Sequence, residues 1–236
     1  MELFKQEQVK QQQDLAAALR LAEHFGYNEG VCNHFSLQTG PDQFLLNPHG
    51  IHWSRMRASD ILSVSSKTGN TEAEISALNI HAAIHDQHSH ARCVLHTHMP
   101  YATSLTCLDR GRLEYVHQNS LRFYNDVAYD DDYGGLADNR EEGDRIAAQM
   151  EDKRVLFLAN HGIIVTGTSI ADAFDRLYYL ERACEVQVLA MSTGRPLKQV
   201  GDNIARKTRE DHDAAGNYAE AHFTALKALL NSDYLD

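Results

Sequence analysis

The sequence predicts a single α/β domain that spans residues 1–236, and three observations support this fold class. Segments with the two-residue period of a strand alternate along the chain with segments that have the period of a helix. No Pro/Ser-rich linker, internal repeat or low-complexity tract marks a boundary between domains. The chain is also long enough to bury a substantial core, so we expect its helices and strands to pack in layers.

Two helices are predicted in the first half of the chain. Residues 7–25 carry apolar side chains at spacings of three and four, and Gly26 can adopt the left-handed conformation that ends a helix. Thr71 and Glu74 fit a capping box, in which the side chains at the first and fourth positions bond each other's backbone N–H groups. This box predicts a second helix over residues 72–86.

Two further helices are predicted in the last third of the chain. Ser169 and Asp172 fit the start of a long helix that runs to Met191, and residues 205–230 also have a helical pattern. The predicted strands are short apolar runs bounded by turn signals, and they cover residues 33–37, 44–47, 59–64, 93–98 and 155–158. The predicted turns and loops cover residues 39–42, 67–70 and 129–135.

Charge and cysteine usage limit the classes of partner. The formal net charge of −11 argues against nucleic acid and against an anionic membrane surface, because both need a basic face on the protein. No apolar run reaches membrane-spanning length, and the N-terminal stretch lacks the apolar region of a secretion signal. The four cysteines are scattered, as is typical of free thiols in a reducing compartment. We therefore expect a cytoplasmic protein.

Three histidines form a candidate metal site. His96 and His98 share one face of the predicted strand 93–98, because side chains alternate along a strand. Two imidazoles on one face can chelate a divalent metal ion, and His161 would complete a three-histidine set with an open position for chemistry. The alternative is that these histidines are ordinary polar residues on a half-buried strand.

Four segments stand in an order and spacing that match one known family. They are the segments 33–37, 46–50, 92–102 and 158–167. Over residues 15–200 the chain resembles the class II aldolase and adducin family. The resemblance implies a three-layer α/β/α sandwich with a mostly antiparallel central sheet, and a homotetramer with active sites at subunit interfaces.

The resemblance also implies a small-molecule substrate and one divalent metal ion, held by His96, His98 and His161. In the aldolases this ion is usually zinc, and imidazole also suits manganese and iron.

The chain departs from the family at the catalytic carboxylate, whose position is held by Ala77. Alanine can neither transfer a proton nor bind a metal. Glu74 lies one helical turn earlier on the same face and is a candidate catalytic substitute, unless it only closes the capping box. His81 and His85 continue that face, and they either bind a metal themselves or support the ligands.

The family's phosphate-binding loops also differ here. His34 and His49 stand at these places and would bind a carboxylate when protonated, or else only pack in loops. Gly50 and Ser76 remain compatible with anion binding. We therefore expect a substrate other than a standard sugar phosphate.

The aldolases use a tyrosine from a neighbouring subunit as a general acid. The spacing from His98 brings that position to His117, and Tyr115 and Tyr124 are close alternatives. A histidine can act as acid or base at neutral pH.

The sequence thus predicts a metal-dependent lyase, either retro-aldol or decarboxylating, for a small hydroxy- or oxo-carbonyl substrate. Both reactions place negative charge on a carbonyl oxygen that a metal ion can stabilise. Decarboxylation needs less proton transfer in its first step and so tolerates Ala77 better. The alternatives are a non-haem iron oxygenase on the same fold and a non-catalytic, adducin-like interaction protein.

Overall fold

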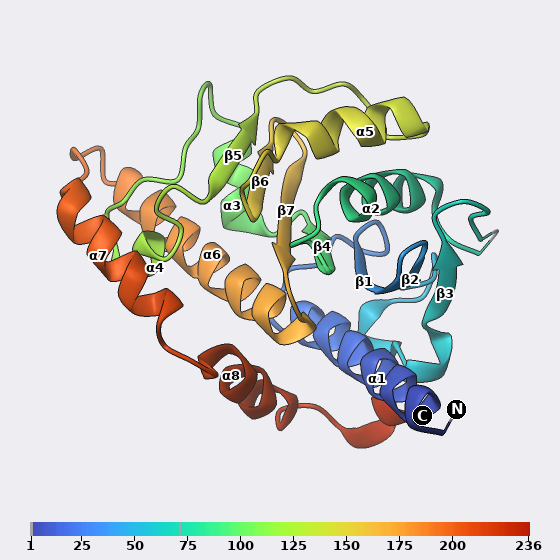
Figure 1. Ribbon diagram of the computed structural model, residues 1–236. Coiled ribbons are helices and arrows are strands. Elements are labelled where there is room, and N and C mark those ends of the chain that lie inside the picture. The colour runs from blue at the N-terminus through green and yellow to red at the C-terminus, as the bar shows by residue number, and fades with distance from the viewer. Residues whose placement is uncertain (1, 71) are drawn as a thin grey trace.

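A computed structural model describes residues 2–70 and 72–236, and its named strands form one seven-stranded sheet (Figure 1). The strands are β1 (His34–Gly40), β2 (Gln43–Leu46), β3 (Leu62–Ser65), β4 (Cys93–Thr97), β5 (Val127–Asp130), β6 (Val155–Leu158) and β7 (Gly162–Gly167). Their order is β3-β2-β1-β4-β7-β6-β5. Five neighbouring pairs are antiparallel and β5–β6 is parallel, which confirms the mixed α/β class with a mostly antiparallel sheet.

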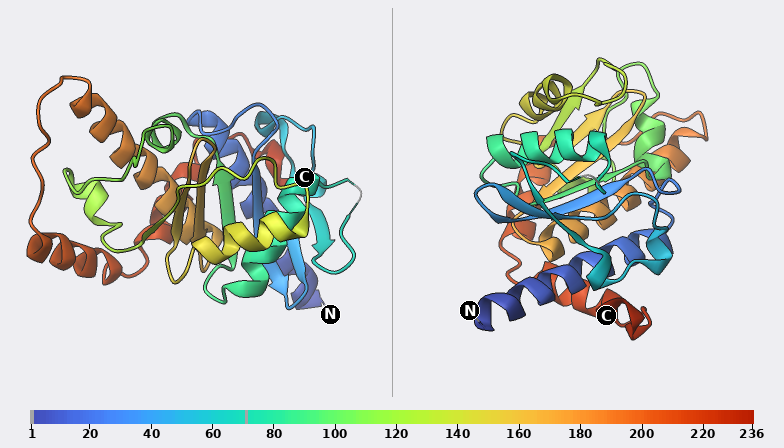
Figure 2. Two further views of the ribbon diagram at one scale, coloured as in Figure 1. Left: turned by 90° about the horizontal axis from the view of Figure 1, so that it is seen from above. Right: turned by 90° about the vertical axis from the view of Figure 1, so that its right-hand side faces the viewer.

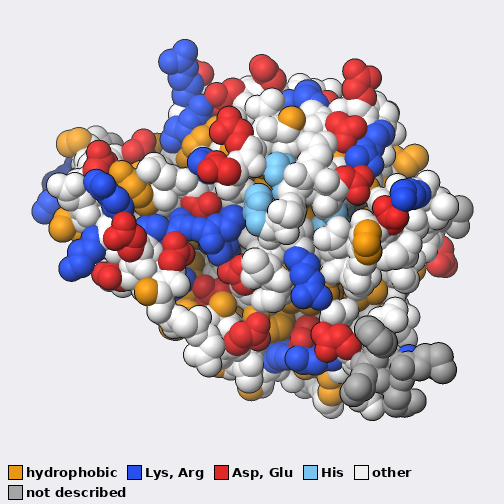
Figure 3. Space-filling model, viewed as in Figure 1, with side chains coloured by type: hydrophobic (Ala, Val, Ile, Leu, Met, Phe, Trp, Pro, Cys, Tyr) orange, Lys and Arg blue, Asp and Glu red, His pale blue; other side chains and the backbone are white. Residues whose placement is uncertain are grey.

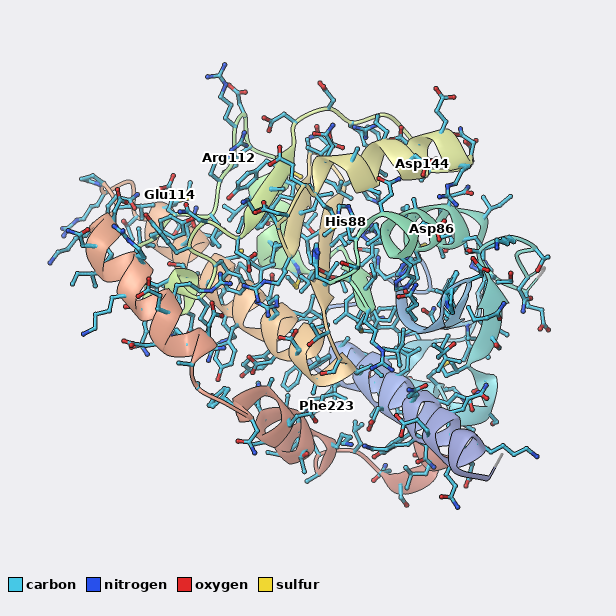
Figure 4. The ribbon with its side chains drawn as sticks, in the orientation of Figure 1. Asp86, His88, Arg112, Glu114, Asp144 and Phe223 are labelled. Carbon is cyan, nitrogen blue, oxygen red and sulfur yellow. The ribbon has the colours of Figure 1, made fainter. Side chains whose placement is uncertain are left out.

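Helices cover both faces of the sheet, so the molecule has three layers (Figure 2). The helices are α1 (Glu2–His24), α2 (Ile75–Gln87), α3 (Pro100–Thr106), α4 (Gln118–Leu121), α5 (Arg140–Gln149), α6 (Ile170–Met191), α7 (Asp202–Asp213) and α8 (Tyr218–Lys227). One face carries α2 and α5, and the other carries α1, α6 and α8. Arg140 on α5 lies 3.0 Å from both Asp86 on α2 and Asp144, which Figure 4 labels on these two helices.

The alternation of side chains along β4 divides the core into two clusters. Cys93 and Leu95 belong to the large cluster beneath α1 and α6, whereas Val94 belongs to the cluster under α2 and α5. His96 follows Val94 by two residues and so shares its face. On β1, which pairs with β4, Phe35 lies in the large cluster. Fully burying such a side chain contributes about 1.5–3 kcal/mol to stability.

The C-terminal segment packs against α1. Residues Ser232–Leu235 form a 3-10 turn, in which Asp233 pairs with Arg20 of α1 at 2.6 Å. The Arg20 Nε atom donates to the Met56 carbonyl at 2.6 Å. Gln13, further back on α1, donates to the Leu235 carbonyl at 3.0 Å. Contacts between residues more than 200 positions apart therefore hold the C-terminal segment against α1.

Several predicted element boundaries are confirmed. β6 covers the predicted residues 155–158, and α1 ends at His24 before Gly26, whose φ is +72°. The Ser169 hydroxyl accepts the Asp172 N–H at 3.1 Å, as expected at the start of α6. The four cysteines are free thiols. None of the described helices is long and apolar enough to cross a lipid bilayer.

The predicted capping box is wrong at Glu74, and Thr71 lies outside the described residues. The backbone at Glu74 is still extended, with φ −67° and ψ 140°, so α2 begins at Ile75 rather than at residue 72. The Glu74 carboxylate instead accepts the Ser76 hydroxyl at 2.8 Å. A residue predicted inside the helix thus stands at its entrance.

Three other predicted elements need correction. Residues 58–60 form a 3-10 turn, because Asp60 accepts the Arg57 N–H, so β3 begins later than residue 59. Gly216 has φ +67° and divides the predicted helix 205–230 into α7 and α8. The predicted loop 129–135 contains the end of β5, whose parallel partner β6 is remote in sequence. β7 and α3–α5 were not predicted.

Glu181 of α6 is a buried carboxylate that caps α3. It accepts the backbone N–H groups of Tyr101 and Ala102, each at 2.8 Å. Burial raises its pKa to about 7, although these two hydrogen bonds oppose the shift. Between pH 4.5 and 7 the folded protein therefore holds a proton that the unfolded chain releases, and stability falls as the pH rises.

We expect Glu181→Gln to remove this pH dependence, because glutamine stays neutral. The free energy of unfolding of the variant, relative to the native protein, should rise by on the order of 3 kcal/mol between pH 4.5 and 7.5. Urea unfolding at several pH values measures this difference. Glu141→Gln, at an exposed carboxylate in the first turn of α5, is the control. If the difference in unfolding free energy between Glu181→Gln and the native protein does not change with pH, the raised pKa does not belong to Glu181.

Candidate metal centre

The candidate site lies where three strand ends meet. β4 runs antiparallel to both β1 and β7, so the C-terminal end of β4 lies beside the N-terminal ends of its two neighbours. His98 follows β4, His161 precedes β7, and His34 begins β1 opposite His96. Four histidines from three segments are therefore carried to one edge of the sheet.

The structure brings His96, His98 and His161 together. Each offers one ring nitrogen, and these nitrogens all lie within 4.8 Å of one another. The His96 Nδ1–H group donates to the Ile163 carbonyl at 2.9 Å, which leaves Nε2 as the free acceptor, and this atom lies 3.2 Å from His98 Nε2. Such a second hydrogen bond is typical of metal-binding histidines, because it fixes the tautomer and the ring orientation.

The protonation states also suit a metal ion. Burial lowers the pKa of His96 well below its ordinary value, and the neighbouring histidines lower it further. Burial and His98 lower the pKa of His161 to about 4, although Glu142 opposes the shift. Neutral imidazole is the form that binds metals, so this set of donors fits one divalent ion.

The turn Asn160-His161-Gly162 is built for close contact. Asn160 has φ +56°, a left-handed conformation that asparagine tolerates better than most residues. A Cβ atom on Gly162 would lie 2.6 Å from His98 Cδ2 and 2.6 Å from the Thr97 carbonyl oxygen. Glycine is thus required for the His98 ring to lie beside the turn that carries His161.

At residue 77, where the family resemblance predicts the catalytic carboxylate, the chain has an alanine. Ala77 is buried in an apolar cluster with Phe44, Leu46 and Val64, on the part of the sheet formed by β2 and β3. The carboxylates that influence the site come from other segments. Burial lowers the pKa of His98, and Glu29 and Glu74 both raise it.

Glu29 is a site residue that the sequence reasoning missed. It lies in the irregular segment between α1 and β1. Asn33 Oδ1 accepts the Glu29 N–H at 2.7 Å and lies 3.5 Å from the His98 backbone nitrogen, so one side chain ties this segment to the end of β4. No motif marks Glu29, because its role depends on this tertiary contact.

Tyr133 and Glu142 lie near His161, and the sequence reasoning missed both. The Tyr133 ring lies 6.2 Å from the His161 ring. Glu142 raises the His161 pKa and is held by Arg145, with both nitrogen–oxygen distances at 2.8 Å. Histidine side chains reach the surface near the middle of the face in Figure 3, among acidic and basic groups.

That His34 binds a carboxylate when protonated stays a prediction. Burial and the adjacent His81 lower the His34 pKa well below its ordinary value, which disfavours a positive charge on the ring. His49 lies 4.0 Å from the Glu74 carboxylate, and Gly50 follows with φ +83°. The hydroxyl of Ser76 is committed to the same carboxylate.

His81 and His85 do not form a metal pair. Both are buried, and both ring nitrogens of each are engaged in hydrogen bonds. His117 and Tyr115 lie beside α4, away from the end of β4 within this chain (Figure 1). The Tyr115 hydroxyl accepts the Asn125 N–H at 3.1 Å, and its ring packs against Tyr124.

Comparisons with known proteins agree on one family. The family model for the class II aldolase and adducin N-terminal domain matches residues 13–188. A Pseudomonas aeruginosa protein named only by its family, as an aldolase class 2 protein, is 35% identical over 203 residues, which cover 84% of this chain and 78% of that protein. Mouse alpha-adducin is 32% identical over 77% of this chain, a match that spans 26% of adducin.

One relative and two solved structures add detail. The decarboxylase NovR of Streptomyces niveus is 28% identical over 82% of this chain and 74% of that protein. An aldolase II superfamily protein from Pseudomonas syringae has a TM-score of 0.89 and 30% identity, covering 97% of this chain and 96% of that one. L-fuculose 1-phosphate aldolase from Glaciozyma antarctica has a TM-score of 0.84 and 25% identity, covering 98% and 94%.

We expect Gly162→Ala to weaken metal binding by about 10- to 100-fold, because the added methyl group displaces the His98 ring. Competition with a chromogenic chelator measures the affinity for zinc. Gly40→Ala is the matched control, since a Cβ atom there meets only the Gln43 side chain at an ordinary 3.8 Å. Equal zinc affinity in the two variants would show that the close approach of His98 to the turn is unimportant.

Proposed function

Because the chain belongs to the class II aldolase and adducin family, we propose that it is a divalent-metal-dependent lyase that cleaves a carbon–carbon bond in a small hydroxy- or oxo-carbonyl compound. The observation that carries this proposal is the convergence of three neutral imidazoles within 4.8 Å. His96, His98 and His161 would hold the ion, with zinc as our assignment and manganese or iron as the other ions that imidazole suits. When bound, the ion supplies Lewis-acid stabilisation of a developing oxyanion.

We assign proton transfer first to Glu74. It stands at the entrance of α2, and its negative charge raises the His98 pKa. Glu29 has the same influence and is the rival carboxylate. Ala77 lies among apolar side chains and takes no part.

The proposed substrate is not a standard sugar phosphate. His49 and Ser76 border the Glu74 carboxylate, which places a negative charge where the family resemblance puts a phosphate. A hydroxyl group can donate to that carboxylate, whereas a phosphate would be repelled. The similarity to a protein named as a decarboxylase supports decarboxylation, and the similarity to L-fuculose 1-phosphate aldolase supports retro-aldol cleavage.

We further propose a cytoplasmic homotetramer in which each site is completed by a neighbouring subunit. His117, or Tyr115 in its place, would supply the general acid. Both residues lie beside α4, on a part of the molecule well away from their own chain's β4, which suits a role at another subunit's site.

Removing one ligand should remove the metal. We expect His96→Ala and His161→Ala to lose most bound zinc, because two imidazoles hold a structural or catalytic zinc ion poorly. Elemental analysis of the purified variants gives the zinc content per chain. His52→Ala, at an exposed histidine, is the matched control.

A panel of 2-hydroxy and 2-oxo acids then tests the reaction by detection of released carbon dioxide or aldehyde, before and after metal removal with a chelator. Full zinc content in His96→Ala would overturn the assigned site. Native protein that never holds metal would favour the adducin-like interaction role. Oxygen consumption by the iron-loaded protein would favour the oxygenase.

Mixed oligomers test the shared site. His96→Ala and His117→Ala should each be inactive, but subunits of the two kinds in one oligomer should form some sites with neither defect. Random mixing of equal amounts predicts about a quarter of native activity. Co-expression with two affinity tags isolates the mixed oligomers for assay. Tyr115→Phe combined with His96→Ala is the second pairing. If neither pairing recovers activity, the acid comes from the same chain as the metal ligands.

A further inference from the structure

A row of buried side chains runs from the candidate metal centre into the layer between β1 and α2. His34 Nδ1 lies 2.7 Å from His81 Nε2, and His81 Nδ1 contacts the Ser36 hydroxyl. The same hydroxyl lies 2.8 Å from His85 Nε2. His85 Nδ1 lies 2.8 Å from the Ala91 carbonyl oxygen, where the row ends. We call these five residues the histidine row.

The carbonyl at the end of the histidine row fixes the direction of every hydrogen bond. A carbonyl oxygen only accepts, so His85 Nδ1 must carry the hydrogen, and in a neutral ring Nε2 must then accept from Ser36. The Ser36 hydroxyl has a single hydrogen and therefore accepts from His81 Nδ1. His81 Nε2 is left as an acceptor, and it receives the hydrogen on His34 Nδ1.

The rings are neutral because charge is costly where they lie. His34, His81 and His85 are all buried, and no described acidic side chain forms a hydrogen bond with any of them. A positive charge on any of these rings would be buried without a paired carboxylate, which is costly. Each neutral ring then has one N–H and one lone pair, as the row requires.

The histidine row leaves His34 Nε2 with a free lone pair. Among the described residues this atom has no hydrogen-bond partner. The His34 ring lies against the His96 ring, with centroids 4.8 Å apart and planes 31° apart, so it borders the candidate metal centre. Because Nδ1 is turned toward His81, Nε2 is at the other side of the ring.

We infer that the histidine row makes His34 a substrate-binding residue, whose Nε2 accepts a hydrogen bond from a hydroxyl group of a ligand at the metal centre. The inference rests on the proposed function and narrows its substrates to compounds with a hydroxyl group next to the group that reaches the metal. His81, Ser36 and His85 are positioning residues, since they act on the ligand only through the tautomer of His34.

Glycolate and acetate are suitable probes, because they differ by the single hydroxyl group. Calorimetry with the zinc-loaded protein gives the ratio of the two dissociation constants. In His34→Phe this preference for glycolate should fall by about five- to tenfold relative to the native protein, with zinc content unchanged. Chelation by the hydroxyl favours glycolate in both proteins, so only the change between them reports on His34.

A second pair of variants tests the positioning role. Ser36→Ala removes the acceptor for His81 and frees His34 to change tautomer, whereas Ser36→Thr keeps the hydroxyl. Ser36→Ala should lower the preference for glycolate over acetate, and Ser36→Thr should keep this preference at the native level. Nitrogen NMR of histidine-labelled protein should give an unprotonated His34 Nε2 in the native and Ser36→Thr proteins. Ser63→Ala, on β3, is the matched serine control.

The outcomes separate the two proposals. Native protein that binds no zinc, or zinc-loaded protein that binds neither probe, overturns the proposed function and the inference with it. Zinc and glycolate binding with an unchanged preference in His34→Phe overturns the inference alone. A protonated His34 Nε2 in the native protein does so as well, even if a variant fails to fold.

Discussion

The antiparallel pairing of β4 with both β1 and β7 is the constraint on which the candidate site depends. It places the end of β4 beside the starts of β1 and β7, two strands that lie more than 120 residues apart in the sequence. The hydrogen-bonded ladders hold His96 within β4, and they place His98 one residue after β4 and His161 one residue before β7. Rigid support of this kind is what a metal centre needs to keep its geometry.

Sequence patterns predicted the parts of the molecule that local chemistry determines. The buried run of β6 and the start of α6 at Ser169 carry their own signals, and so does the repeat of histidines around Thr97. β5 was not predicted, because the strand that stabilises it, β6, is a parallel partner remote in sequence. The position of Glu29 was not predicted, because it depends on a tertiary contact with Asn33. The lowered pKa of His34 was not predicted either, because it depends on burial against α2.

Helix α2 explains how the chain keeps the family fold while its polar groups are rearranged. Ala77 faces the apolar cluster under β2, and His81 and His85 face Ser36 one and two turns later. Glu74 stands at the helix entrance, outside the regular turns. Ala77, where the resemblance to the aldolases predicts a carboxylate, thus contributes to packing. The polar side chains of this helix lie instead at its entrance, at Glu74, and further along, at His81 and His85.

The pairing of Arg20 with Asp233 also bears on how the chain is made. The two residues are 213 positions apart, so Asp233 leaves the ribosome long after α1 has emerged. At about 5–20 residues per second, α1 waits roughly 10–40 s for this partner. During translation the nascent α1 exposes an apolar face that only later segments cover. Helix α1 is therefore among the last described elements to acquire its complete environment.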